Sequence, residues 1–218
     1  MKALSSIWLK NPAGIFTANA QDASNGIVVS NKIIVELVAK GQQPQTPINH
    51  LIDGNKLAIT PGLINTHHHF YQTLTRCVPQ ALNRPLFPWF KTLCQVWKNL
   101  DPDMPVSATK LASLELMMSG ATTVCAHHYV FPNGLEYGID IQVAALDKLG
   151  CRATLTPGSM SLGEKGGGLA PDSVLQTEDI ILQDSEQVVK AFHQPDEGIL
   201  LAGICYAPPL TICSTAVA

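Results

Sequence analysis

Strand-like and helix-like segments alternate after residue 57, and this alternation limits the folds that the chain can adopt. The β-branched or apolar stretches are Leu57–Asn65, Thr122–His127, Arg152–Thr156 and Ile199–Ala207. Between them lie segments whose apolar residues have helical spacing: Phe87–Asn99, Met104–Ser119, Gly138–Leu149 and Glu178–His193. Such an order predicts a parallel sheet whose strands are joined by crossover helices.

Two α/β architectures fit this order, an open doubly wound sheet and a (β/α)8 barrel. No Gly-x-Gly-x-x-Gly motif follows the first strand, so a Rossmann-type nucleotide site is not supported. Histidines at the end of the first strand favour the barrel, because barrel enzymes place their chemistry at the C-terminal ends of the strands. A complete barrel takes about 250 residues. We therefore expect residues 61–218 to form the N-terminal half of a TIM-like (β/α)8 barrel, truncated and with open parallel edges.

The first 60 residues have a different character, with short β-rich stretches at Ile7–Leu9, Gly26–Val29 and Lys32–Val38. Asn25-Gly26 and Asp53-Gly54 are turn signals. Residues 1–60 are therefore predicted to form a small β-domain that precedes the barrel.

Composition narrows the classes of function. Charged residues make up 14% of the chain, against about 25% in typical domains. The net charge of −3 provides no basic surface for nucleic acid or anionic lipid. The sequence shows no signal peptide, no membrane-length apolar run and no Cys-x-x-Cys pair, so we expect a cytoplasmic protein that binds neither nucleic acid nor membrane.

His67 and His69 carry the chemistry of the first barrel strand. Residues two apart on a strand point to the same face, so both imidazoles can reach one ion while His68 points away. Imidazole nitrogen is a common ligand of zinc, iron, cobalt and nickel. The pattern predicts a divalent metal site at His67 and His69.

The segment Pro61–His69, with the sequence PGLINTHHH, resembles the first-strand signature Pro-Gly-x-x-x-x-His-x-His of the amidohydrolase superfamily. The similarity continues through Phe70–Arg76, Ala126–Pro132 and Gly158–Gly163. These later segments resemble the branch that contains 8-oxoguanine deaminase and hydroxyatrazine ethylaminohydrolase.

The resemblance implies a distorted (β/α)8 barrel of a metal-dependent hydrolase and a β-sandwich composed of the segments before and after it, of which residues 1–60 would be one part. It implies one divalent metal, zinc with iron as the alternative, bound in part by His67 and His69. The family's remaining ligands and proton-transfer groups follow strands five, six and eight, so the catalytic residues are expected beyond residue 218.

The implied activity is hydrolytic deamination of an aminated, purine-like heterocycle of the 8-oxoguanine type, in which metal-activated water cleaves a C–N bond. The partner would be a small heterocyclic amine, and a homo-oligomer of the full-length form is compatible with the family. Two alternatives stay open: a truncated, catalytically inactive fragment or pseudoenzyme, and a related triazine chlorohydrolase.

Four residues are candidates for substrate binding. Gln72 lies three positions after His69, as a glutamine does in the related guanine deaminases, and its amide can both donate and accept hydrogen bonds. His127 and His128 end the second strand, so that one is expected to line the pocket and the other to pack outside the barrel. Tyr129 follows them directly.

Overall fold

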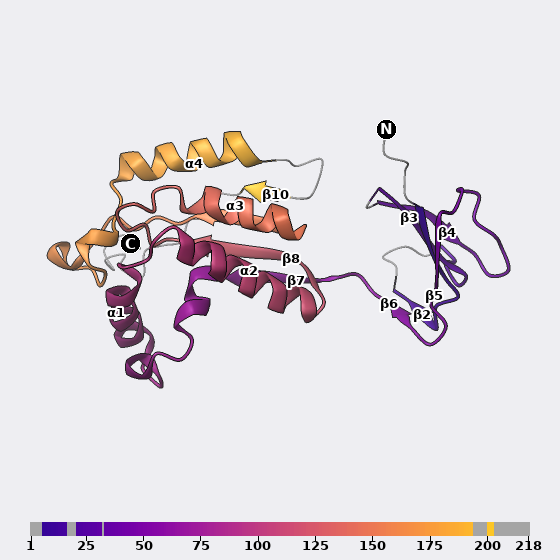
Figure 1. Ribbon diagram of the computed structural model, residues 1–218, viewed down its shortest axis with the longest axis horizontal. Helices are drawn as coiled ribbons and strands as arrows, with labels where there is room; N and C mark the ends of the chain where they lie inside the picture. Colours follow the sequence, from indigo (N-terminus) through magenta and orange to yellow (C-terminus); the bar gives the residue numbers. More distant parts are fainter. Residues whose placement is uncertain (1–5, 17–20, 32, 194–199, 203–218) are drawn as a thin grey trace, which may run out of the picture. The chain divides into compact units, whose positions relative to one another are not determined.

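The computed structural model describes residues 6–16, 21–31, 33–193 and 200–202, and the chain forms two compact units, residues 1–61 and 62–218. Figure 1 labels the helices and strands of both units. Each unit has its own sheet and core.

Unit 1 is built on a four-stranded sheet with the order β4-β3-β1-β5. The strands are β1 (Ser6–Lys10), β3 (Gly26–Ser30), β4 (Ile33–Val38) and β5 (His50–Asp53). β3 pairs antiparallel with β1 and with β4, whereas β5 pairs parallel with β1. The short strands β2 (Gly14–Ile15) and β6 (Ala58–Ile59) form a separate parallel pair. The β-rich stretches predicted in this unit are confirmed as strands over the described residues, and Lys32 lies outside them.

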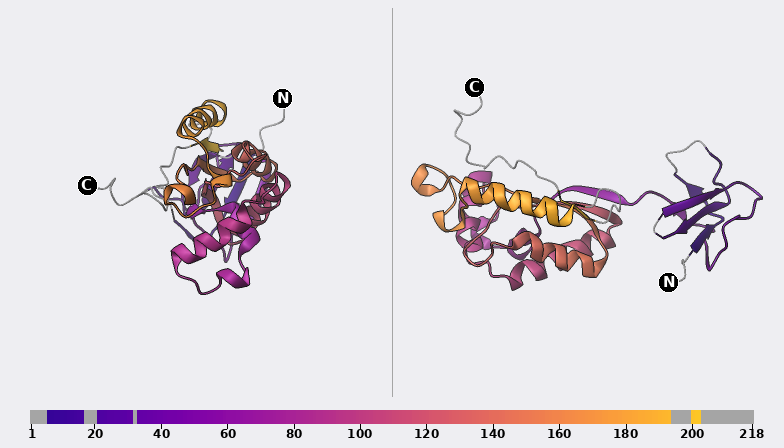
Figure 2. Two further views of the ribbon diagram at one scale, coloured as in Figure 1. Left: turned by 90° about the vertical axis from the view of Figure 1, so that its left-hand side faces the viewer. Right: turned by 90° about the horizontal axis from the view of Figure 1, so that it is seen from above.

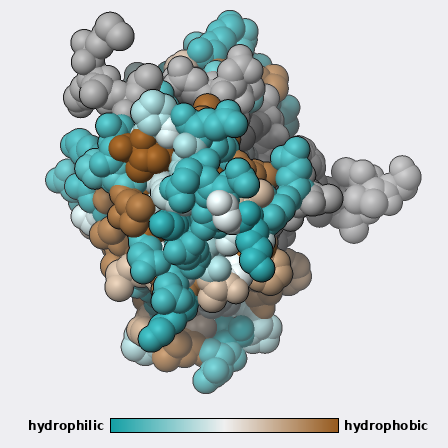
Figure 3. Space-filling view, turned by 90° about the vertical axis from the view of Figure 1, so that its right-hand side faces the viewer, coloured by the Kyte–Doolittle hydropathy of each residue, from teal (hydrophilic) through white to brown (hydrophobic). Residues whose placement is uncertain are grey.

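The core of unit 1 is small. Trp8, Val28 and Val38 are buried together, and the Trp8 indole donates a hydrogen bond to the carbonyl of Asn25 over 3.2 Å. Gly26 begins β3 with a φ of +110°, and a Cβ there would lie 1.8 Å from a backbone oxygen of β1, so only glycine fits. In the space-filling view of Figure 3, hydrophobic residues form separate brown patches in a mostly hydrophilic surface.

Unit 2 contains a four-stranded parallel sheet with the order β10-β9-β8-β7. Its strands are β7 (Leu63–His68), β8 (Ala121–His128), β9 (Arg152–Pro157) and β10 (Leu200–Ala202). The strands therefore lie side by side in the order of the sequence, as the alternation of strands and helices predicted. Closure into a barrel, and completion of unit 1 as a composite sandwich, remain predictions.

Four helices accompany this sheet: α1 (Leu86–Trp97), α2 (Asp103–Met118), α3 (Gly138–Leu149) and α4 (Glu178–Phe192). α2 contacts β8, α3 contacts β9, and α4 contacts both β9 and β10. Figure 2 shows from two further sides that α2, α3 and α4 lie alongside the strands. The core between them is apolar and includes Val124, Ala126, Leu146, Leu155 and Val188. No helix among the described residues has the length and hydropathy of a membrane span.

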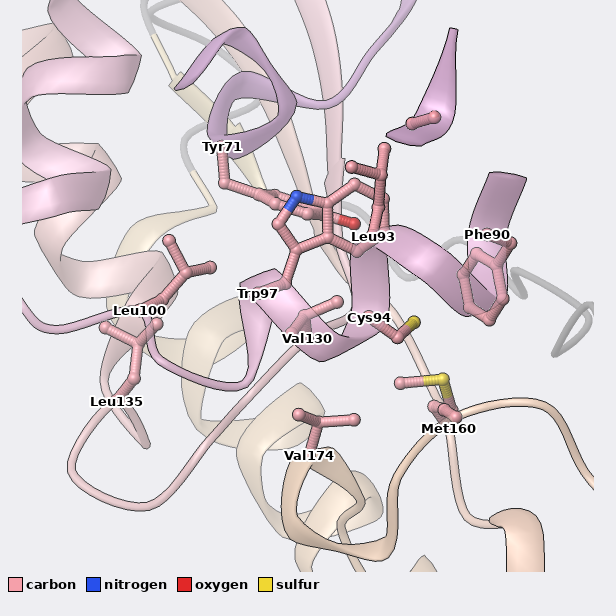
Figure 4. Packing of buried hydrophobic residues seen from close by; sticks show 12 residues of the cluster. Tyr71, Phe90, Leu93, Cys94, Trp97, Leu100, Val130, Leu135, Met160 and Val174 are labelled. Carbon is pink, nitrogen blue, oxygen red and sulfur yellow. The ribbon is translucent and has the colours of Figure 1, made fainter. Parts of the chain in front are cut away.

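A second hydrophobic cluster joins α1 to the segments that leave the C-terminal ends of the strands. Trp97 is fully buried in it, its ring edge-on to Tyr71 with centroids 5.1 Å apart (Figure 4). The Trp97 indole also donates to Thr75 Oγ1 over 3.1 Å, which links α1 to the 3-10 helix η1 (Phe70–Thr75). This cluster holds η1 in place directly after β7, where the predicted metal ligands lie.

The strand predicted over Leu57–Asn65 differs from the observed one. Residues 58–59 belong to β6 in unit 1, the Pro61-Gly62 pair separates the two units, and β7 begins at Leu63 and runs on through His67. Proline has no N–H to donate to a strand ladder, which accounts for the break. Of the strand predicted over Ile199–Ala207, only residues 200–202 fall in the described part of the chain, where they form β10.

Candidate functional site

His67 and His69 lie together at the C-terminal end of β7. Their Nε2 atoms are 3.0 Å apart, and their rings are edge-on with centroids separated by 4.8 Å. The alternation of side chains along the strand produces this pairing. His67 is the last but one residue of β7, and His69, two positions later, comes directly after the end of β7 and before η1.

The hydrogen bond of His69 determines which of its nitrogens carries the proton. His69 Nδ1 lies 2.9 Å from the backbone oxygen of His127, and a carbonyl oxygen only accepts, so Nδ1 is the donor. In the neutral ring, Nε2 then keeps its lone pair and faces His67. Burial lowers the pKa of His69 to about 4, which keeps the ring neutral at physiological pH.

This pair suits a divalent metal ion in its chemistry. A neutral imidazole whose second nitrogen is tied to a carbonyl is the usual form of a metal-ligating histidine. Two nitrogens alone fall short of the three protein ligands usual for catalytic zinc. In the described part of the chain, no group of three or more His, Cys, Asp or Glu side chains is arranged to hold a metal.

His127, at the end of β8, lies beside this pair. Its ring centroid is 5.1 Å from that of His67 and 5.8 Å from that of His69. Its Nδ1 lies 2.6 Å from the hydroxyl of Thr156 on β9, which fixes the ring. Burial, with a smaller contribution from the charge of His67, lowers the pKa of His127. His127 is thus the one of the two terminal histidines of β8 that faces the candidate site.

His128 faces the opposite side of the sheet and is fully buried. Its Nε2 donates to the carbonyl of Val130 over 2.9 Å, and its Nδ1 accepts from the side-chain amide of Gln142 in α3 over 2.9 Å. Both ring nitrogens are therefore used in joining β8 to α3. His128 is one of the candidate substrate-binding residues, and here it contacts α3 and the carbonyl of Val130, so its role in substrate binding stays a prediction.

Gln72 and Tyr129 contact each other beside the histidine pair. Gln72 Nε2 donates to the Tyr129 hydroxyl over 3.1 Å. The Tyr129 ring is edge-on to His69 with centroids 5.1 Å apart. Burial raises the pKa of Tyr129 to about 12, so the phenol stays protonated at neutral pH.

An open hollow of about 380 Å³ is bordered by His67, His69 and Gln72, whereas His127 and Tyr129 are not among its lining residues. Its lining residues are His67, His68, His69, Gln72, Thr73, Thr75, Arg76, Trp89 and Leu93, so that His68, which we expected to point away, also borders the hollow. Two further neighbours of the site were not predicted from the sequence: Trp89, which lines the hollow, and Thr156, which contacts His127. Trp89 lies 22 residues from His67 along the chain, and only the docking of α1 against η1 brings it to the same hollow.

Comparison with known proteins places this geometry in a family. The sequence profile of the Amidohydrolase family matches residues 58–217. The chain is 51% identical over 195 residues to 8-oxoguanine deaminase from Pseudomonas aeruginosa, covering 89% of this chain and 43% of that protein. It is 32% identical over 142 residues to hydroxydechloroatrazine ethylaminohydrolase from a Pseudomonas species, covering 64% of this chain and 30% of that protein.

The fold is also similar to solved structures. The crystal structure of atrazine chlorohydrolase from Arthrobacter aurescens TC1, complexed with zinc, superposes with a TM-score of 0.76 at 23% identity over 91% of this chain and 46% of that one. The chain thus spans less than half of the length of each of these proteins. The family match, the first-strand histidines and the shared fold agree, and the chain belongs to the amidohydrolase family.

Proposed function

We propose that this chain provides the first two metal ligands and part of the substrate pocket of a metal-dependent hydrolase that deaminates a purine-like heterocycle of the 8-oxoguanine type. The observation that carries the proposal is the His67–His69 pair at the end of β7, with Nε2 atoms 3.0 Å apart and the His69 tautomer fixed by a carbonyl. The 51% identity to an 8-oxoguanine deaminase supports this substrate class.

A divalent metal bound there, with zinc favoured over iron, would supply Lewis acidity and the means to generate a water-derived nucleophile at neutral pH. The reaction replaces the exocyclic C–N bond of the ring by a C–O bond and releases ammonia. In this chain His67 and His69 would hold the ion, and His127 and Gln72 would border the bound ring. The groups that transfer protons are not among these residues, and we expect them to follow the later strands of the family's barrel.

Metal binding tests the first part of the proposal. Zinc affinity is measured by competition with a chromophoric chelator for the unmodified chain, His67→Ala and His69→Ala, with His50→Ala as the matched control because His50 is exposed in unit 1. We expect either site variant to lose about 10-fold or more in affinity, and His50→Ala to match the unmodified chain. Equal affinity in all four proteins would refute the assignment of the ligands.

Activity tests the second part. Ammonia release from 8-oxoguanine is measured for the zinc-loaded chain alone and for the chain mixed with the C-terminal part of the Pseudomonas aeruginosa 8-oxoguanine deaminase, since the chain matches 43% of that enzyme. We expect little or no turnover by the chain alone, because two histidines are an incomplete ligand set. The mixture should turn over 8-oxoguanine, and replacing His67 by alanine should abolish that turnover. No turnover in either case would favour a catalytically inactive chain.

The second candidate function is hydrolysis of a chlorinated or alkylamino-substituted triazine. It is favoured by the similarity of the fold to atrazine chlorohydrolase and by the 32% identity to the ethylaminohydrolase. The same preparations assayed with atrazine and hydroxyatrazine distinguish the two, because faster turnover of a triazine than of 8-oxoguanine would reverse the order of these proposals.

A further inference from the structure

The side-chain amide of Gln72 has two ends of nearly equal shape and opposite hydrogen-bonding character. Half a turn about its last torsion exchanges the carbonyl oxygen, which accepts, for the NH₂ group, which donates. What a ligand in the hollow meets therefore depends on what holds the amide. Gln72 borders the hollow beside His67 and His69, whereas Tyr129, which accepts the hydrogen bond from Gln72 Nε2, does not border it.

Tyr129 is itself held in place by its neighbours. Its ring packs edge-on against His69 and against Tyr71, with centroids 5.1 and 5.7 Å apart, and lies 6.2 Å from the ring of Phe90. The backbone of Gly158 approaches so closely that a Cβ at residue 158 would lie 2.4 Å from the Tyr129 Cβ. The phenol therefore presents its oxygen from a nearly fixed position.

The backbone of Gln72 is fixed as well. Its N–H donates to the carbonyl of His69 over 3.0 Å, and its own carbonyl accepts from Thr75 Oγ1 over 3.1 Å. Among the described residues, no protein group donates a hydrogen bond to Gln72 Oε1. The remaining freedom lies in the side chain, whose Nε2 donates to the Tyr129 hydroxyl.

We propose that Tyr129 is a positioning residue that holds the Gln72 amide by its Nε2 end, so that Oε1 faces the hollow and accepts a hydrogen bond from an N–H of the ligand. This inference rests on the proposed function and makes its substrate class narrower. The site would select a flat heterocycle that carries a ring N–H or an exocyclic amine at the edge facing Gln72. A ring with only acceptor atoms at that edge would meet the oxygen unfavourably and bind less well.

A double-mutant cycle tests whether Tyr129 acts through Gln72. The dissociation constant of 8-oxoguanine is measured by quenching of tryptophan fluorescence, since Trp89 borders the hollow, for the unmodified chain, Tyr129→Phe, Gln72→Ala and the double variant. Tyr137→Phe is the matched control, because Tyr137 is 68% exposed. We expect Tyr129→Phe to weaken binding about 3- to 10-fold in the unmodified background and less than about 1.5-fold in the Gln72→Ala background. An equal loss in both backgrounds, which would indicate direct contact between Tyr129 and the ligand, or no loss in either, overturns the proposal.

A measurement without ligand separates this inference from the proposed function. The side-chain NH₂ signals of Gln72 are identified in a ¹H–¹⁵N spectrum by their absence in Gln72→Ala. Tyr129→Phe should shift these signals and Tyr137→Phe should leave them in place. If the unmodified chain neither binds nor deaminates 8-oxoguanine, the proposed function fails, and the spectrum still decides whether Tyr129 holds the amide. Unshifted signals in Tyr129→Phe overturn the positioning role even if the chain is an active deaminase.

Discussion

His128 provides a quantitative test of the packing behind the candidate site. The ring is fully buried, and burial lowers its pKa from the ordinary value of 6.5 to about 4. The folded protein therefore binds a proton at His128 less readily than the unfolded chain does. Because the unfolded state binds more protons between these two pKa values, stability is unaffected above pH 6.5, falls as the pH drops from 6.5 to about 4, and levels off below that.

The magnitude follows from the same values. One pKa unit corresponds to about 1.4 kcal/mol, so His128 should lower the free energy of unfolding by about 3 kcal/mol across this window. Replacement by phenylalanine removes the titrating group. It also leaves the carbonyl of Val130 and the amide of Gln142 without their partners. Each buried unsatisfied group costs about 1–3 kcal/mol, so His128→Phe should be less stable than the unmodified chain by about 2–6 kcal/mol at pH 7.5.

Urea unfolding followed by circular dichroism, at pH 7.5, 6, 5 and 4 and with a chelator present, measures both effects. The other histidines titrate in both proteins, so the difference between the two isolates His128. We expect the stability gap between the unmodified chain and His128→Phe to shrink by about 3 kcal/mol from pH 7.5 to pH 4. A gap that stays constant within about 0.5 kcal/mol would show that His128 is not buried as a neutral ring. The placement of His128 on the side of β8 that packs against α3 would then be wrong.

Two further predictions concern close packing in unit 2. Gly158→Ala should reduce stability by about 1–3 kcal/mol in thermal or urea unfolding, because a Cβ there meets the Tyr129 Cβ at 2.4 Å. The control Gly14→Ala, where a Cβ meets nothing within 4 Å, should change stability by less than about 0.5 kcal/mol. Equal effects of the two substitutions would contradict the reasoning. Iodoacetamide at pH 8, followed by peptide mass spectrometry, should modify the exposed Cys77 and leave Cys94 unmodified, since Cys94 is buried and its pKa is raised to about 12. Labelling of Cys94 as fast as that of Cys77 in the folded chain would show that the cluster around α1 is open.

Much of the secondary structure of unit 2 follows from local patterns in the sequence. The spacing of apolar residues predicted four helices, observed at 86–97, 103–118, 138–149 and 178–192. Each observed helix begins and ends within two residues of its predicted bounds. The strand leading to His67 was placed less well, because Pro61-Gly62 marks both a strand break and the division between the units. An apolar run does not reveal which of two neighbouring sheets its residues will join.

The site shows the same division between local and distant information. His67 and His69 were expected on one face because they lie two residues apart on one strand. The contact between Gln72 and Tyr129 was not expected, because 57 residues separate them and the hydrogen bond forms only where η1 lies against the end of β8. The polarity of the Gln72 amide could be read only from that contact.

Local sequence alone was enough to place His67 and His69 on one face, and to predict that one of His127 and His128 would face the site and the other the packing side. Side-chain alternation along a strand is a property of the backbone, and the sequence displays it directly. The packing of the folded chain selects which of these two histidines takes which side. Gln142 of α3 and the carbonyl of Val130 capture both nitrogens of His128 inside the core, and this leaves His127 beside His67 and His69. Which face of a strand is buried depends on how the neighbouring helix packs against it, and the local pattern of residues does not contain that packing.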